Sequence, residues 1–453
     1  MSTIAERLAE WVSGLTLERL PSSVVREAKR CIIDVTGVAL AGAAHETSRK
    51  VRALAASESA RGAATVWSAT DESFSAGAAA LCNATAAHVL DYDDTCYDGI
   101  VHGSAAVWPA VLACGEALRA NGARLLEAFV AGVETEYALG RALSDEIYFE
   151  GWWTSGVLGS IGAAAAAARM LQLDAQQTCH AISLATCQAT GVRAMIGTAA
   201  KPYALGRASQ AGVQAALFAQ AGLDAPRDAF ESERGFIKVF AAGTFDESKL
   251  QLGERYSLLQ PGIAFKLYPA CSATQAATEA VVKLVTDHDV TAADVESVEC
   301  EVTPLVAISL MYDRPASVTE AQFSLPHAVA CALRYRELGV RQMNEPSFTD
   351  PEMLALMQKV RMIRSDTLEP TEEGRRANPE GARVSIKLHD ARLLELYNGA
   401  ATGMPSKPMP DAALDAKFLE CATTALTRAR ALALLEKLRG LERCEDAREL
   451  LCG

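Results

Sequence analysis

Residues 159–168 read Gly-Ser-Ile-Gly followed by six alanines, and residues 206–212 read Gly-Arg-Ala-Ser-Gln-Ala-Gly. Side chains this small let two helices approach each other closely. A helix that is small or apolar on every side is typical of the interior of a large protein. Both segments therefore predict central helices that are buried on several sides.

Helical periodicity extends outward from these segments, from residue 1 to about residue 260. Further helices are predicted over residues 1–15, from residue 22 or 23 through residue 35, and over residues 78–90, 124–143 and 175–190. Ser22 or Ser23 is expected to cap the second of these helices, and Asp174 is expected to cap the last. The first 268 residues are therefore predicted to form most of an all-helical domain.

After Tyr268 the sequence adds strand signals to the helical ones. Residues 295–302 and 384–388 alternate apolar and polar side chains, residues 360–363 form a third candidate strand, and residues 274–285 and 322–333 remain helical. The Gly- and Pro-containing stretch 399–410 is typical of a linker, and residues 411–438 are helical again. We therefore predict a mainly α protein, with an all-helical domain at 1–268 and 400–453 and a smaller α/β domain at 269–399.

Composition limits the classes of function. Of the 453 residues, 50% are apolar and 22% are charged, and no run reaches the roughly 18 apolar residues of a membrane span. The N-terminus lacks the basic start and apolar centre of a signal peptide, and twelve scattered cysteines without CxxC pairs are typical of a reducing compartment. We expect a cytoplasmic protein that does not bind membranes.

The net charge is −13 and no long basic run interrupts it, so nucleic-acid binding is not expected. An anionic substrate would require several Lys, Arg or His side chains gathered in one pocket, because the surrounding charge repels anions. The sequence contains no motif for binding dinucleotides or nucleoside triphosphates, and none of a zinc protease or a hydrolase nucleophile elbow. These classes have no support.

Three motifs carry candidate chemistry, and the first is acidic. It is LDYDDT (90–95), which follows His88 and precedes His102, Gly103 and Ser104. Carboxylates this close together tend to share a proton or to attract a cation. The alternatives are a solvated acidic turn or an Mg²⁺ site, although no second acidic motif or basic diphosphate clamp accompanies it.

The other two motifs each contain a lysine. Lys201 lies in GTAAKPYALGRAS (197–209), just before a helix of small residues, where a helix N-terminus also favours anions. Lys266 lies in FKLYPACSATQ (265–275), among apolar and aromatic residues at the predicted domain boundary. Such surroundings either lower the pKa of a lysine or hold it charged against a carboxylate, and clefts between domains are common ligand sites. A solvated surface lysine is the alternative for Lys201.

The motifs together resemble those of the MmgE/PrpD family in order and spacing. The matching segments are LDYDDT (90–95), HGS (102–104), GTAAKPYALGRAS (197–209), RGFIKVF (234–240), FKLYPACSATQ (265–275), FSLPHAVA (323–330) and PMPDAALDAKF (408–418). The resemblance covers almost the whole chain. It implies a large all-helical domain, a smaller α/β lid domain, a cleft between them, a homodimer, and neither a cofactor nor a metal.

The resemblance also implies roles for individual residues. The family's acid and threonine correspond to Asp91 and Thr95, its loop histidine to His102, and its two lysines to Lys201 and Lys266. Substrate contacts are further expected from Ser104, Trp153, Tyr268, Ser272 and His327.

The sequence departs from the family pattern at GWWTSG (151–156), where G-F-H-P-T is usual among the decarboxylases and dehydratases. Trp153 then stands at the position of an active-site histidine, unless Trp152 fills that position and Trp153 only packs. Ala204 likewise stands where a histidine is common, and His327 where a tyrosine is often found. We expect a smaller and less polar pocket beside Trp153, which favours a shorter substrate such as a dicarboxylate.

The family includes 2-methylcitrate dehydratase, cis-aconitate decarboxylase and iminodisuccinate epimerase, which share proton transfer at a carbon next to a carboxylate. The resemblance implies a metal-free enzyme of this kind acting on a small di- or tricarboxylate, and a hydroxy-acid dehydratase-type lyase is the leading hypothesis. An epimerase, a decarboxylase and a non-catalytic ligand-binding protein are the alternatives. Lys201 and Lys266 are expected to hold carboxylates, His102 or one of the lysines to exchange the proton, and Asp91 to orient it.

Overall fold

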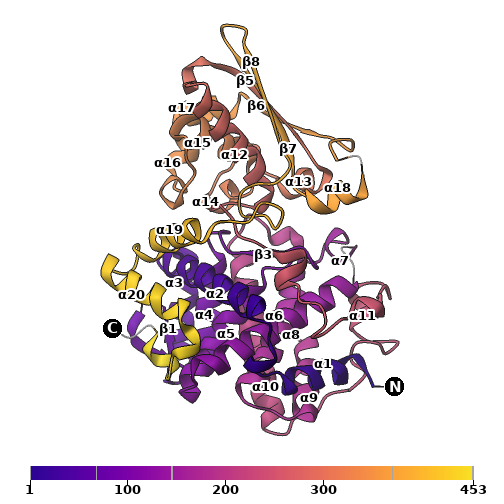
Figure 1. Ribbon diagram of the computed structural model, residues 1–453. Coiled ribbons are helices and arrows are strands. Elements are labelled where there is room, and N and C mark those ends of the chain that lie inside the picture. The colour runs from indigo at the N-terminus through magenta and orange to yellow at the C-terminus, as the bar shows by residue number, and fades with distance from the viewer. Residues whose placement is uncertain (1, 68, 144–145, 370, 451–453) are drawn as a thin grey trace.

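The computed structural model describes residues 2–67, 69–143, 146–369 and 371–450, and its two largest apolar cores are separate. The larger core draws on residues from Ile4 to Phe265 and again from Met409 to Leu450, whereas the smaller core lies between Ala264 and Met404. Figure 1 shows the smaller part above the larger one, with the C-terminal helices returning to the larger part. We propose that the two parts correspond to the predicted domains, 1–268 with 400–453 and 269–399.

Helices build nearly all of the larger part. They are α1 (Ile4–Gly14), α2 (Ser22–Gly42), α3 (Glu46–Glu58), α4 (Ala76–His88), α5 (Gly103–Leu118), α6 (Gly122–Leu143), α7 (Glu146–Phe149), α8 (Thr154–Met170), α9 (Ala175–Thr186), α10 (Ala200–Gln220), α11 (Phe236–Phe240), α19 (Asp411–Ala422) and α20 (Arg428–Arg439). Helix α8 is buried continuously from Thr154 to Ala168 and packs against α6 and α10. A methyl group added at Gly212 would collide with Ala163, so only small residues permit this approach. The prediction of buried central helices is confirmed.

The smaller part is a four-stranded sheet packed against helices. Its elements are α12 (Ser272–Asp287), β5 (Val295–Val302), α13 (Pro304–Ser309), α14 (Val318–Ala321), α15 (Leu325–Tyr335), α16 (Pro346–Thr349), α17 (Pro351–Met357), β6 (Val360–Arg364), α18 (Glu372–Ala377), β7 (Ala382–Leu388) and β8 (Leu393–Asn398). The strand order is β6-β5-β7-β8, with β5 parallel to β6 and the other pairs antiparallel. Alternate residues of β7 are buried, as half-buried strands require. The predicted fold class, mainly α with a small α/β part, is confirmed, and β8 is an additional strand.

Local features differ from the predictions at several points. Helix α2 begins at Ser22 and has Pro21 at its N-cap position without a side-chain hydrogen bond, so the expected serine cap is wrong. Pro21 is extended (ψ 139°), which leaves Ser22 already inside the first turn. Asp174 does cap α9, whose end at Thr186 comes earlier than predicted. The predicted helix 411–438 is two helices, α19 and α20.

Two short antiparallel strand pairs accompany the helices of the larger part. They are β1 (Ala64–Val66) with β2 (Ala69–Phe74), and β3 (Thr95–Cys96) with β4 (Ile263–Ala264). The second pair joins the end of the acidic motif to the segment just before Lys266, and so brings two motifs that are distant in the sequence together.

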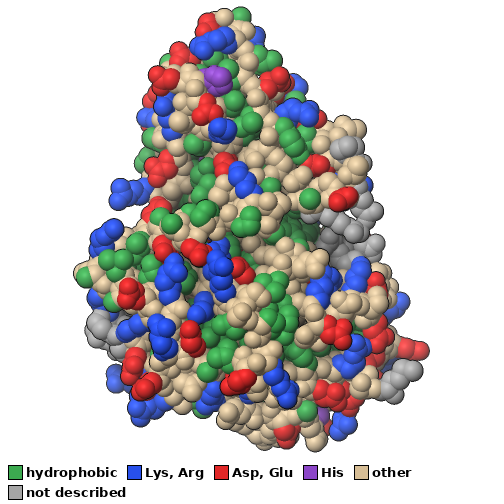
Figure 2. Space-filling model, in the orientation of Figure 1, with side chains coloured by type: hydrophobic (Ala, Val, Ile, Leu, Met, Phe, Trp, Pro, Cys, Tyr) green, Lys and Arg blue, Asp and Glu red, His purple; other side chains and the backbone are tan. Residues whose placement is uncertain are grey.

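The distribution of charged side chains on the surface is consistent with the lack of a long basic run in the sequence. On the face shown in Figure 2, Lys and Arg side chains are interspersed with Asp and Glu, without a large basic patch on that face. Within the described residues, no helix is both long enough and apolar enough to cross a membrane.

Candidate active site

Helices from both parts begin around one cavity. His102 and Trp153 occupy the N-cap positions of α5 and α8, Lys201 lies in the first turn of α10, and Ser272 begins α12. The unpaired N–H groups and positive dipole ends of helix N-termini favour an anionic ligand. The cavity is lined by Asp91, Thr95, Ile100, His102, Tyr148, Trp153, Ile196, Lys201, Cys271, Ser272, Leu305, Ser309, Phe323 and Glu380.

The acidic motif is a buried turn and not a solvated one. Helix α4 ends at His88, and Asp91 then adopts a left-handed backbone conformation with φ of 49°. Asp91, Asp93 and Asp94 are 2%, 0% and 0% exposed, respectively. Buried carboxylates need charged or hydrogen-bonding partners, so the partners of these groups define the site.

Asp91 binds both predicted lysines. Its Oδ1 lies 2.5 Å from Lys201 Nζ, while Lys266 Nζ lies 3.0 Å from Oδ2 and 2.7 Å from the Asp91 carbonyl oxygen. Burial by itself raises the pKa of Asp91, but the two ammonium groups outweigh burial and lower that pKa well below its usual value. Burial opposes the charge of Lys266 as well, yet Asp91 and Asp93 raise the pKa of Lys266. Lys201 lines the cavity and is only 5% exposed, so it is not a surface lysine, whereas Lys266 lies behind Asp91.

His88 had no predicted role, yet it contacts both Lys201 and Asp93 at the site. Its Nε2 is 2.6 Å from Lys201 Nζ, and its Nδ1 is 2.8 Å from Asp93 Oδ2. Because an ammonium group can only donate, Nε2 accepts from Lys201 and Nδ1–H donates to Asp93. Burial lowers the pKa of His88 and outweighs the opposing effect of Asp93, so the ring is neutral. One feature of the sequence could have identified His88 as a site residue, namely its position at the end of an apolar helix, three residues before Asp91.

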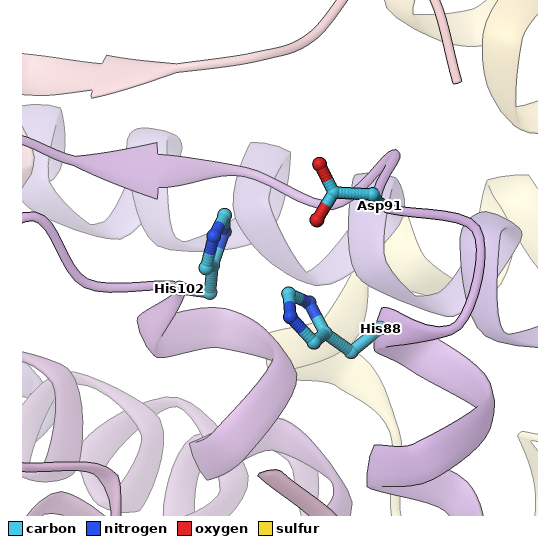
Figure 3. A group of neighbouring side chains, drawn as sticks. All are labelled: His88, Asp91 and His102. Atoms are coloured by element: carbon cyan, nitrogen blue, oxygen red, sulfur yellow. The ribbon is translucent and has the colours of Figure 1, made fainter. Parts of the chain in front are cut away.

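Figure 3 shows the rings of His88 and His102 and the carboxylate of Asp91 turned toward one another. One donor atom from each residue lies within 4.8 Å of the other two, a spacing that could also hold a metal ion. Two of these groups, however, are bonded to Lys201 Nζ. The ammonium group thus occupies the position between them, and a metal ion would first have to displace it.

His102 presents one nitrogen to the cavity and uses the other for support. Its Nδ1 lies 2.9 Å from the Asp94 carbonyl oxygen and 3.3 Å from Thr95 Oγ1. The carbonyl can only accept, so Nδ1 carries the proton and Nε2 is the basic nitrogen of the neutral ring. Burial is the largest cause that lowers the pKa of His102 well below its usual value, and Lys266 and His88 lower it further against Asp93. The neutral ring is a candidate proton acceptor.

Ser104, Tyr268 and His327 do not line the cavity. Ser104 Oγ donates a hydrogen bond to Asp94, and Tyr268 packs in the smaller core. His327 is 0% exposed, and its Nε2 lies 2.8 Å from Ser347 Oγ. The structure therefore differs from the expected substrate contacts at these residues, because each side chain is already committed to a buried neighbour.

Trp153, and not Trp152, faces the site. The ring of Trp153 lies 5.4 Å from that of His88 and 5.5 Å from Lys201 Nζ. Trp152 packs instead against Phe240, with ring centroids 4.7 Å apart. Trp153 supplies an apolar wall where a histidine would supply a hydrogen-bonding group.

Several lining residues were not predicted, among them Tyr148, Cys271, Phe323 and Glu380. Cys271 and Phe323 belong to motifs identified in the sequence, and Phe323 lies against Lys201 Nζ, 5.3 Å from the ring centroid. Glu380 comes from the loop before β7 in the smaller part. No motif marked it, because its approach to the site depends on how the two parts pack.

Comparison with known proteins agrees with this arrangement. The model of the MmgE/PrpD N-terminal domain matches residues 6–248, and that of the MmgE/PrpD C-terminal domain matches residues 268–441. The chain is 27% identical over 469 aligned positions to a cis-aconitate decarboxylase of Mus musculus, covering 100% of this chain and 94% of the relative. It is 26% identical to a cis-aconitate decarboxylase of Homo sapiens, and the alignment covers 98% of this chain and 93% of the relative. A cis-aconitate decarboxylase of Aspergillus terreus is 24% identical to this chain, and the alignment covers 99% of this chain and 95% of the relative. The chain belongs to the MmgE/PrpD family.

Proposed function

We propose that the protein is a metal-independent lyase that removes a proton next to a carboxylate of a small hydroxy-dicarboxylate and then eliminates water. The observation that carries the proposal is the neutral ring of His102, whose Nδ1 is held by the Asp94 carbonyl and whose ring lines a cavity surrounded by helix N-termini. A fixed tautomer leaves Nε2 as the only basic nitrogen of that ring.

His102 acts as the base once the substrate is bound. In the free site, burial and nearby cations hold its pKa well below the usual value. A bound dianion adds negative charge beside the ring and raises its pKa toward the value at which a general base is effective.

Lys201 stabilises the charge that develops on the substrate carboxylate. Its Nζ is held by Asp91 and His88 and lies 5.5 Å from the ring centroid of Trp153 and 5.3 Å from that of Phe323. A preorganised cation in a partly apolar cavity stabilises an enolate-like transition state more strongly than water does. Lys266 acts through Asp91, because it lies behind that carboxylate.

The ring of Trp153 favours a four-carbon substrate over a tricarboxylate, since it fills the space beside Lys201 and offers no base. A decarboxylase of the cis-aconitate type is the second candidate. It is favoured by the activity for which the relatives are named, since they align along nearly the whole chain.

Proton exchange tests the proposal directly. Malate, tartrate, citrate, 2-methylcitrate, cis-aconitate and iminodisuccinate are incubated with the protein in D₂O and followed by ¹H NMR. We expect exchange and loss of water with a C4 hydroxy acid. Decarboxylation of cis-aconitate would establish the second candidate, and inversion without elimination would establish an epimerase.

Replacement of His102 tests its role as the base. His102→Gln keeps a polar side chain and removes the base, so exchange is expected to fall at least about 100-fold. His389→Gln is the matched control, because His389 is exposed in a loop of the smaller part. Equal rates in both variants would contradict the role of His102.

We also propose that the protein works as a homodimer, as the family resemblance implies, and that it does so in the cytoplasm, as its scattered cysteines indicate. Light scattering coupled to size-exclusion chromatography tests the dimer, and a monomer at micromolar concentration would contradict it.

A further inference from the structure

Glu380 is the only acidic residue that the smaller part contributes to the lining of the described cavity. It lies between α18 and β7, is 8% exposed, and shares the cavity with His102 and Lys201 of the larger part. Its Oε2 accepts a hydrogen bond of 2.6 Å from the hydroxyl of Tyr97. Tyr97 lies in the segment between Asp91 and His102, so this bond links that segment to the smaller part.

The surroundings of Glu380 keep a large fraction of this carboxyl protonated at neutral pH. Burial is the largest effect and raises the pKa of Glu380 to about 7, against the hydroxyls of Tyr97 and Ser272 and the charge of Lys266. The charge of Asp91 contributes to raising it. Burial also raises the pKa of Tyr97 well above its usual value and that of Cys271 to about 12, so neither neighbour loses its proton in the same range.

Elimination of water needs an acid that the residues discussed so far do not supply. Lys201 and Lys266 are held by Asp91, and His102 already takes a proton. A hydroxide ion is a poor leaving group, so the departing oxygen has to be protonated as the carbon–oxygen bond breaks.

We propose that Glu380 is the general acid that protonates the leaving hydroxyl of the substrate. The inference rests on the proposed function. His102 Nε2 takes the proton from carbon, the electron pair of that C–H bond becomes the carbon–carbon double bond, and the carbon–oxygen bond breaks. Glu380 gives its proton to the leaving oxygen, which departs as water. Solvent then returns a proton to Glu380 and takes one from His102, which restores both groups.

A substrate pair that differs only in its leaving group separates this role from a structural one. Malate needs an acid to lose its hydroxyl, whereas 2-chlorosuccinate loses chloride without one. Glu380→Gln keeps an acceptor for the Tyr97 hydroxyl but cannot donate this proton. We expect it to lower kcat/KM about 100-fold for malate and less than about 3-fold for 2-chlorosuccinate.

The controls distinguish the possible failures. His102→Gln is expected to slow both substrates, because both must lose the proton from carbon. Glu301→Gln, in an exposed ion pair with Arg383 on the same sheet, is expected to change neither rate. Equal losses for malate and 2-chlorosuccinate in Glu380→Gln, or no loss for either, would overturn the role of Glu380 alone. A native protein that eliminates neither compound would overturn the proposed function, and this inference with it.

The pH profile supplies a second readout. An acid must be protonated to act, so kcat/KM for malate is expected to fall as pH rises through about 7, the pKa of Glu380. The profile for 2-chlorosuccinate should lack this limb. Tyr97→Phe removes a hydrogen bond that favours the ionised form and is expected to move the limb to higher pH. A limb that is unchanged in Tyr97→Phe, or present for both substrates, would contradict the assignment.

Discussion

Lys266→Met removes the ammonium group behind Asp91 and keeps a side chain of similar length. The side chain of Lys266 is 1% exposed, and its Nζ makes bonds of 2.7 Å and 3.0 Å to the carbonyl and carboxylate of Asp91. The variant therefore leaves Asp91 with Lys201 as its single cationic partner among the described residues. Lys201 is then drawn more strongly to Asp91 and is less available to a substrate carboxylate.

The magnitude follows from the loss of a charged hydrogen bond in a buried site. Such a bond contributes about 1.5 to 3 kcal/mol. If the transition state loses all of this stabilisation, kcat/KM falls about 10- to 150-fold. Part of the same free energy is lost from folding, so stability should decrease in parallel.

The assay measures initial rates on the best substrate of the exchange panel, together with circular dichroism and a thermal melt. Lys387→Met is the matched control, because Lys387 is 52% exposed in a pair with Glu296. Lys266→Arg retains the charge and is expected to recover part of the activity. A folded Lys266→Met protein that keeps more than about a tenth of the native kcat/KM would refute the role of Lys266.

The remaining predictions concern specificity, metal independence and stability. Trp153→His is expected to raise kcat/KM for C6 tricarboxylates relative to C4 dicarboxylates, while Trp152→His is not; cis-aconitate or 2-methylcitrate as the best native substrate would contradict this. Exhaustive EDTA treatment is expected to leave turnover unchanged because Lys201 lies between the candidate metal donors, and activity restored by Mg²⁺ would argue the opposite. Lys417→Met removes the cation 2.7 Å from the buried carboxylate of Asp34, and urea unfolding should show a loss of about 3 to 5 kcal/mol. A loss below about 1 kcal/mol would mean that this pair contributes little.

Local patterns were sufficient for much of the fold. The strand at 295–302 was predicted with its observed bounds, since alternation along a strand depends only on neighbouring residues. The small residues of α8 likewise predicted close helix packing, and Asp174 was identified as a cap from its own position in the chain. Short motifs shared with the family were enough to select Asp91, His102, Lys201 and Lys266 as candidate site residues.

The sequence by itself thus predicted the main helices, three strands of the smaller part and the family, because these depend on short-range patterns and on motifs. It also named six of the residues that line the cavity, which are Asp91, Thr95, His102, Trp153, Lys201 and Ser272. Only the tertiary structure decided their partners. Lys201 and Lys266 are 110 and 175 positions from Asp91, yet both bind its carboxylate, and Trp153 instead of Trp152 faces them. Tertiary packing also places His327 against Ser347 in the smaller part and Glu380 at the wall of the cavity. Such contacts depend on how helices and sheet pack over long separations, and periodicity along the chain carries no information about that.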